Sequence, residues 1–313
     1  MDETTRMLDL LNEVFPDITT MPPLEARAVV DARVRTPANL DAVASAEDHV
    51  LGGPGATVRI RVYRPHEPRP VPATVYLHGG GFLHGSIESH DGFCREWARG
   101  TGSVVVSVDM RLAPEHTAPA PADDVLTAID TVTAWGLDEG RGIVVAGDSS
   151  GGNLAAVVAI ALRDRGDSPL VGQVLAYPFL DPTTSRASYT TRAEGYFVTA
   201  RQLRYYWSTY LGADPAEVAS DWRIAPALAA THEGLPPAIV ITAGLDPLTD
   251  EGAAYAQTLV AAGVPVVHRH YPDQFHGFLT IPGYGPGIAA SGILWSDFAR
   301  TFRTAPTLEE VAR

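Results

Sequence analysis

The sequence lacks several features that define whole classes of protein. It contains a single cysteine, Cys94, so an intrachain disulfide and a cysteine-based metal cluster are both excluded. It has no run of about 18 apolar residues, so we predict no membrane-spanning helix. Lysine is absent, and the net charge of −14 argues against nucleic acid and anionic membranes as partners, because both require a positive surface.

The apolar content, in contrast, is ample. A chain of 313 residues with 45% hydrophobic residues can bury a large core as one α/β domain, alone or with a small accessory part. Residues 1–4 are acidic where a secretory signal would be basic, so we expect a cytoplasmic protein.

From residue 73 onward, short apolar strands alternate with helices, which predicts a mostly parallel sheet covered by helices on both faces. An alternating pattern over residues 44–63, interrupted by a glycine-rich turn at 52–55, predicts an antiparallel hairpin before it. The predicted division has four parts. They are an N-terminal helical segment (1–40), the first part of the core (41–180), an insertion (181–222) and the C-terminal part of the core (223–313).

The N-terminal helical segment has two interpretations. Its apolar residues recur at helical spacing, so its helices either pack on the core or cover a substrate pocket. The insertion interrupts the strand–helix alternation with proline, threonine, arginine and aromatic residues.

The strongest local pattern is an apolar strand that enters a Gly-Asp-Ser-Ser-Gly turn at residues 147–151 and leaves it through an alanine-rich helix. In such a unit Ser149 takes a strained backbone angle, and Gly147 and Gly151 lack the Cβ atoms that would keep strand and helix apart. The helix N-terminus directs unpaired N–H groups to the same place. The alternative is a glycine-rich turn with an idle serine, but the strand-before, helix-after setting favours a nucleophile.

A second glycine-rich stretch, Leu-His-Gly-Gly-Gly-Phe at residues 77–82, follows the first parallel strand. Consecutive glycines can present backbone N–H groups without side-chain bulk, so we predict that Gly79 and Gly80 form an oxyanion hole with Ser150. A phosphate-binding loop is the alternative, but the usual lysine and glycine spacing are missing. His78, at the strand end, is predicted to be structural.

A serine nucleophile needs a base, and the base needs a carboxylate to orient it. Asp246 and His276 each follow a predicted strand near the C-terminal end of the chain. The order Ser149, Asp246, His276 is the one expected of an α/β hydrolase. Taken singly, the aspartate is typical of a turn and the histidine of a solvated loop, but together they predict a catalytic triad.

Other reactive residues are weaker candidates. His268 and His270 alternate on one strand face, which could suggest a metal pair, but no third ligand is apparent and a surface or interface position is favoured. Cys94 is placed on a helix among apolar neighbours, without a paired base. We therefore predict no metal site.

Five motifs, at residues 78–82, 111–116, 147–152, 246–248 and 276–278, together resemble the bacterial hormone-sensitive-lipase-like (family IV) carboxylesterases. The resemblance implies an α/β-hydrolase fold with a mostly parallel eight-stranded sheet. It also implies a small helical cap, made from the N-terminal helical segment and the insertion, and hydrolysis of acyl esters without a cofactor. One departure is Ser150, where the family usually has alanine.

The predicted function is that of a serine carboxylesterase acting on short- to medium-chain acyl esters through an acyl-enzyme. An amidase, lactonase or formamidase would use the same triad, and a noncatalytic ligand-binding protein on this fold is a further alternative. Four aromatic residues are predicted to line the substrate pocket: Phe82, Tyr196, Phe197 and Tyr206. The last strand, at residues 265–271, is expected at the sheet edge, where it could pair with a second copy in a homodimer.

Overall fold

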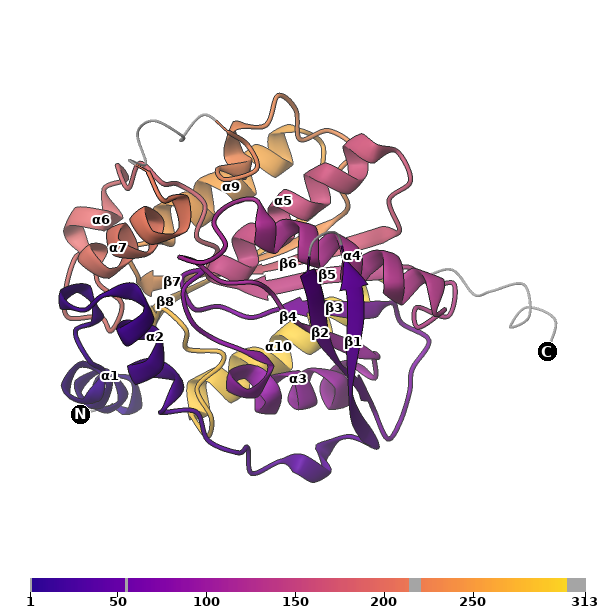
Figure 1. Ribbon diagram of the computed structural model, residues 1–313, viewed down its shortest axis with the longest axis horizontal. Helices are drawn as coiled ribbons and strands as arrows, with labels where there is room; N and C mark the ends of the chain where they lie inside the picture. Colours follow the sequence, from indigo (N-terminus) through magenta and orange to yellow (C-terminus); the bar gives the residue numbers. More distant parts are fainter. Residues whose placement is uncertain (1, 54–55, 214–220, 303–313) are drawn as a thin grey trace.

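One eight-stranded sheet crosses the molecule in the order β1-β2-β4-β3-β5-β6-β7-β8 (Figure 1). Strands β1 and β2 form the antiparallel hairpin, β2 pairs antiparallel with β4, and the remaining pairs are parallel. The α/β-hydrolase fold and the mostly parallel eight-stranded sheet are therefore confirmed. The strands are β1 Ser45–Gly53, β2 Ala56–Arg64, β3 Ala73–Leu77, β4 Val105–Asp109, β5 Ile143–Asp148, β6 Leu170–Ala176, β7 Ala238–Leu245 and β8 Val266–Phe275.

This computed structural model describes residues 2–53, 56–213 and 221–302. Part of the predicted hairpin turn (54–55), part of the insertion (214–220) and the end of the chain (303–313) lie outside the described residues. Within the described residues, no helix has the length and apolar character needed to span a bilayer.

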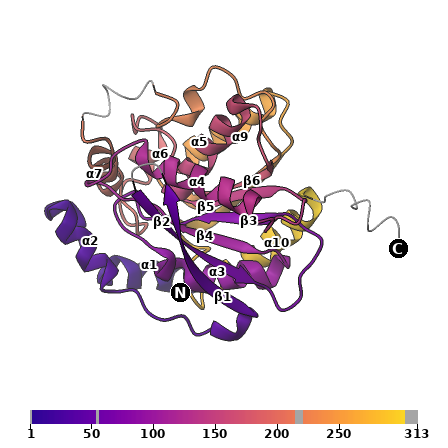
Figure 2. The ribbon, with the colours of Figure 1, turned by 45° about the vertical axis from the view of Figure 1, so that its right-hand side comes forward.

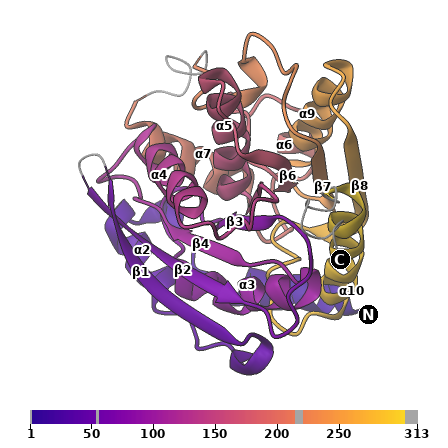
Figure 3. The same cartoon turned by 90° about the vertical axis from the view of Figure 1, so that its right-hand side faces the viewer.

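Helices cover both faces of the sheet (Figure 3). Helices α4, α5 and α9 pack on one face, and α3 and α10 pack together on the other. The central strand β5 is buried along its whole length, which explains why its sequence is apolar on both faces. These helices are α3 Ile87–Thr101, α4 Ala120–Ala134, α5 Ser150–Arg165, α9 Thr249–Ala261 and α10 Gly285–Thr301.

A group of smaller helices gathers at one end of the sheet (Figures 1 and 2). Helices α1 (Glu3–Val14) and α2 (Pro23–Asp31) come from the N-terminal helical segment, and α6 (Ser188–Thr191) and α7 (Ala200–Leu211) come from the insertion. We call these four helices, together with the segment that joins α6 to α7, the cap. Its two parts touch directly, since Asn12 of α1 donates to Gly195 O at 2.9 Å and accepts from Phe197 N at 3.0 Å.

Candidate active site

The turn between β5 and α5 holds Ser149 in a strained conformation, with φ 56° and ψ −119°. The turn can close this tightly only because its flanking residues have no side chain. A Cβ on Gly147 would lie 2.4 Å from the carbonyl carbon of Gly151, and a Cβ on Gly151 would lie 2.0 Å from Leu77 O. Ser149 therefore sits at the sharp strand-to-helix turn that the sequence predicts.

The structure brings Ser149, His276 and Asp246 together. The Nε2 atom of His276 lies 2.9 Å from Ser149 Oγ, and its Nδ1 atom lies 2.8 Å from Asp246 Oδ2. All three side chains are buried, with Asp246 fully enclosed. This geometry allows the imidazole to take a proton from the serine while the carboxylate fixes its orientation.

Neighbouring groups hold the triad in place. The second carboxylate oxygen of Asp246 accepts a hydrogen bond from Leu248 N at 2.8 Å, which fixes the carboxylate plane. The ring of Tyr177 packs against the imidazole of His276, with 4.9 Å between ring centroids. The aspartate and the histidine are thus each fixed by a contact outside the triad.

The glycine-rich loop after β3 lies beside the nucleophile, but one of its predicted roles is wrong. The N–H of Gly79 donates to the Asp148 carboxylate at 2.9 Å, so it is not available to a substrate oxygen. The approach is so close that a Cβ on Gly79 would lie 2.4 Å from Asp148 Oδ2. The first glycine of this loop therefore anchors the loop to β5.

Three backbone N–H groups near Ser149 have no hydrogen-bond partner among the described residues: those of Gly80, Gly81 and Ser150. Gly80 and Gly81 have φ values of 126° and 63°, which turn the backbone in a way that side chains disfavour. A Cβ on Gly81 would lie 2.3 Å from the ring of Tyr206. Gly81 was not among the predicted donors. The contact of Gly79 N with Asp148 moves the free N–H groups to Gly80 and Gly81, and the sequence does not show that contact.

The cap fastens this loop from the other side. Arg27 of α2 donates through Nε to Leu83 O at 2.7 Å and through Nη2 to Ala113 O at 2.5 Å. The same guanidinium makes a two-pronged ion pair with Glu115. No sequence pattern singles out Arg27, because its role depends on the packing of α2 against two loops distant in the chain.

The insertion is anchored at its root by residues of the core. Asn153 of α5 donates to Phe179 O at 2.9 Å and to Ile224 O at 2.8 Å, so it ties together the two ends of the insertion. Glu251, five residues after the triad aspartate, accepts from Leu180 N at 2.6 Å. Burial raises the pKa of Glu251 well above its usual value, although the backbone hydrogen bond acts in the opposite direction.

The predicted substrate-binding residues occupy different environments. Phe82 is buried and stacks on Tyr210 of α7, with 3.8 Å between ring centroids, so it joins the loop to the cap. Tyr206 covers Gly81 and bonds through its hydroxyl to His84 at 2.8 Å. Phe197 lies 3.8 Å from the position of a Cβ on Gly277, which directly follows His276, whereas Tyr196 lies under the guanidinium of Arg192.

The remaining candidates lie away from the triad. His268 and His270 both bond to Thr242 Oγ1, each at 2.9 Å, and no group of three or more possible metal ligands occurs among the residues that the structure describes. Cys94 is buried in α3, and burial raises the pKa of its thiol.

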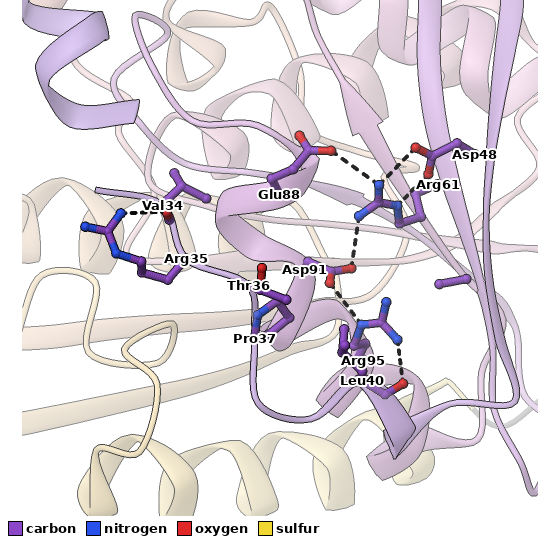
Figure 4. Close-up of a pocket in the computed structure, with 11 residues that line it drawn as sticks. Val34, Arg35, Thr36, Pro37, Leu40, Asp48, Arg61, Glu88, Asp91 and Arg95 are labelled. Carbon is purple, nitrogen blue, oxygen red and sulfur yellow. Dashed lines mark hydrogen bonds and ion pairs between the residues drawn. The ribbon is translucent and has the colours of Figure 1, made fainter. Parts of the chain in front are cut away.

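A pocket of about 520 Å³ lies between the segment after α2 and the surface of β2 and α3 (Figure 4). Most of its charged side chains pair with one another, as Asp48 does with Arg61 and Asp91 with Arg95. Arg35 instead donates to backbone carbonyl oxygens. None of the triad residues lines it, so it is separate from the site described above.

Comparison with known proteins gives a consistent result. The family described as "alpha/beta hydrolase fold" matches residues 74–280. The carboxylesterase NlhH of Mycobacterium tuberculosis is 38% identical over 296 residues, which cover 90% of this chain and 91% of the relative. The solved structure of an ester hydrolase from the metagenome of Lake Arreo, in complex with a bipyridine phosphonate derivative, has a TM-score of 0.88 and 37% identity. That match covers 96% of this chain and 99% of the other.

A relative with a different role is also found. The gibberellin receptor GID1B of Arabidopsis thaliana is 34% identical over 221 residues, which cover 68% of this chain and 62% of the receptor.

Proposed function

Since the chain belongs to the hormone-sensitive-lipase-like family of α/β hydrolases and is a carboxylic ester hydrolase, we propose that it is a serine esterase that cleaves short- to medium-chain acyl esters through an acyl-enzyme. The observation that carries the proposal is the continuous hydrogen-bonded chain from Ser149 through His276 to Asp246. A receptor-like, noncatalytic role is disfavoured because this chain of groups is complete.

In the first half of the reaction, Ser149 Oγ attacks the ester carbonyl carbon while His276 Nε2 takes the serine proton. The carbonyl oxygen becomes negative and receives hydrogen bonds from the N–H groups of Gly80, Gly81 and Ser150. His276 then gives its proton to the leaving alcohol, and the acyl group remains on Ser149. In the second half, water loses a proton to His276 and its oxygen attacks the acyl carbon. The bond from that carbon to Ser149 Oγ then breaks, His276 returns the proton to Oγ, and the acid is released.

The preference for short and medium acyl groups is supported by the enclosure of the site. Ser149 and His276 are only 7% and 6% exposed, and aromatic cap residues lie beside the loops that carry the reaction. Each methylene that reaches apolar surface adds about 0.8 kcal/mol of binding, and this gain stops when the pocket is full. Efficiency should therefore peak with acyl length and then decline.

The test uses Ser149→Ala and His276→Ala with an activated short ester. Each should lower turnover by roughly 10⁴, and the double variant should be little worse, because the two residues act as a unit. Matched acyl ester, amide and lactone substrates would separate the esterase from the amidase, lactonase and formamidase alternatives. Substantial activity of Ser149→Ala in a clean preparation would contradict the assignment.

A further inference from the structure

Three histidines surround the glycine-rich loop, and two of them are neutral. Burial lowers the pKa of His78, and the positive charge of nearby His90 lowers it further. Burial likewise lowers the pKa of His84 to about 3, with His78 and His90 adding to the effect. His90 is the one of the three that faces a carboxylate, that of Asp148.

Each ring nitrogen of His90 faces an oxygen atom. Ser89 Oγ lies 2.8 Å from His90 Nδ1 and also 2.8 Å from Ser86 O, a carbonyl oxygen that can only accept. With the serine proton directed to this carbonyl, the serine oxygen accepts from Nδ1. On the other side of the ring, Nε2 faces Asp148 Oδ1 at 3.3 Å, and the two side chains are only 12% and 7% exposed. An imidazole that donates from both nitrogens is an imidazolium.

Asp148 is the residue that this charge faces. Its Oδ1 also accepts from Tyr76 Oη at 2.7 Å and from Gly79 N at 2.9 Å. Burial acts to raise the pKa of Asp148, but the charge of His90 and these hydrogen bonds outweigh it, and the pKa is lowered. Asp148 is thus a buried carboxylate next to the nucleophile, and it anchors the loop that carries Gly80 and Gly81.

A bare carboxylate here would oppose catalysis. The transition state places a negative charge on the substrate oxygen, and a second negative charge close by in a water-poor site would raise its energy. The rings that pack near His90 are those of Tyr76 and His78, and neither carries a positive charge that could replace it.

We propose that His90 is a positioning residue, held as an imidazolium, that neutralises Asp148 beneath the oxyanion hole while Asp148 anchors Gly79. The inference rests on the proposed esterase function. In this inference Asp148 anchors the glycine-rich loop, whereas Asp246 orients His276. It also explains why a charged histidine lies under a loop whose other two histidines are neutral.

The test compares His90→Gln with the double variant His90→Gln/Asp148→Asn. Glutamine leaves Asp148 charged and without its cationic partner, so kcat should fall by about tenfold while KM stays within about twofold. The double variant removes both charges and keeps an oxygen that can accept from Gly79, so its kcat should return to within about threefold of wild type. Values of kcat are counted per active site by titration with a phosphonate that reacts with Ser149.

His268→Gln is the matched control, since it makes the same substitution at a histidine on β8 outside the site, and it should leave kcat unchanged. Nitrogen-15 NMR of histidine-labelled wild-type protein at neutral pH should show both ring nitrogens of His90 protonated. Equal kcat values for the single and double variants, no loss in His90→Gln, or a neutral His90 by NMR would overturn the inference. Absence of esterase activity in wild type would instead refute the proposed function, and the NMR result would still decide the charge of His90.

Discussion

Replacement of Arg27 by alanine should weaken both the stability of the fold and the chemistry of the site. The Arg27 side chain is 20% exposed, and its guanidinium binds the carbonyl oxygens of Leu83 and Ala113, two fully buried residues. Hydrogen bonds from a charged donor contribute about 1.5 to 3 kcal/mol each. Water can enter the space left by the side chain and satisfy part of this loss, so we expect the free energy of unfolding to fall by about 2 to 4 kcal/mol.

The ion pair with Glu115 should account for little of this effect. The Glu115 side chain is 45% exposed, and ion pairs in such positions contribute at most about 1 kcal/mol. Glu115→Gln is therefore the matched control, because it removes the charge of the partner and leaves both carbonyl contacts in place. We expect it to lower the free energy of unfolding by less than about 1 kcal/mol.

The free energy of unfolding is measured from urea unfolding curves that are fitted with one common m value, and kcat is measured per active site. Arg27→Ala should also lower kcat, because Leu83 belongs to the loop that contains Gly80 and bonds back to it, from Leu83 N to Gly80 O at 3.2 Å. If Glu115→Gln destabilises the protein as much as Arg27→Ala does, the ion pair dominates and the reasoning from the carbonyls is wrong. An unchanged unfolding midpoint in Arg27→Ala would refute it as well.

Three other predictions follow from the same structure. The hydrogen bond from Arg59 lowers the pKa of Glu88 to about 2, so its stabilisation is complete above the usual value of 4.5 and is lost as the pH falls towards 2. The urea concentration at the unfolding midpoint should be higher for wild type than for Glu88→Gln above pH 4.5, and this difference should disappear as the pH falls towards 2. A difference that does not change with pH would contradict the stabilising role of the Glu88 carboxylate. Removal of residues 1–40 should flatten the dependence of kcat/KM on acyl length, whereas an unchanged profile in a folded protein would exclude the N-terminal helices from length selection. Strand β8 lies at the sheet edge, so light scattering at micromolar concentration should give twice the mass of the chain, and a monomer mass would remove the predicted dimer.

The sequence predicted the elements whose signals are local. Strand β3 begins at residue 73, where the predicted alternation of strands and helices begins, and β5 was recognised from its apolar residues and from the glycines that follow it. Ser149, Asp246 and His276 could be singled out because each lies in a short motif directly after a strand, and parallel strands bring their C-terminal ends to one edge of the sheet. Strand β8 runs to Phe275 rather than ending near residue 271, so His276 follows it directly.

The sequence could not predict how the glycine-rich loop is held. Three consecutive glycines look alike in a sequence, and only the position of Asp148 on the neighbouring strand shows that the first N–H is occupied. Phe82 looked like a pocket residue because it is aromatic and follows the loop, but its contacts with Tyr210 depend on where α7 packs. The contacts of Arg27 with distant loops likewise have no local signal.

The loop that carries Gly80 and Gly81, the proposed oxyanion donors, is fixed from three directions, and two of them come from the cap. Asp148 holds Gly79 from the core, Arg27 of α2 holds Leu83, and Tyr206 of α7 covers Gly81 and bonds to His84. A change in the cap therefore reaches the hydrogen-bond donors as well as the walls of the pocket. Loss of acyl-length selectivity after truncation should for this reason be accompanied by a lower kcat for every substrate, including the shortest, since the donors act on the carbonyl oxygen that all esters share.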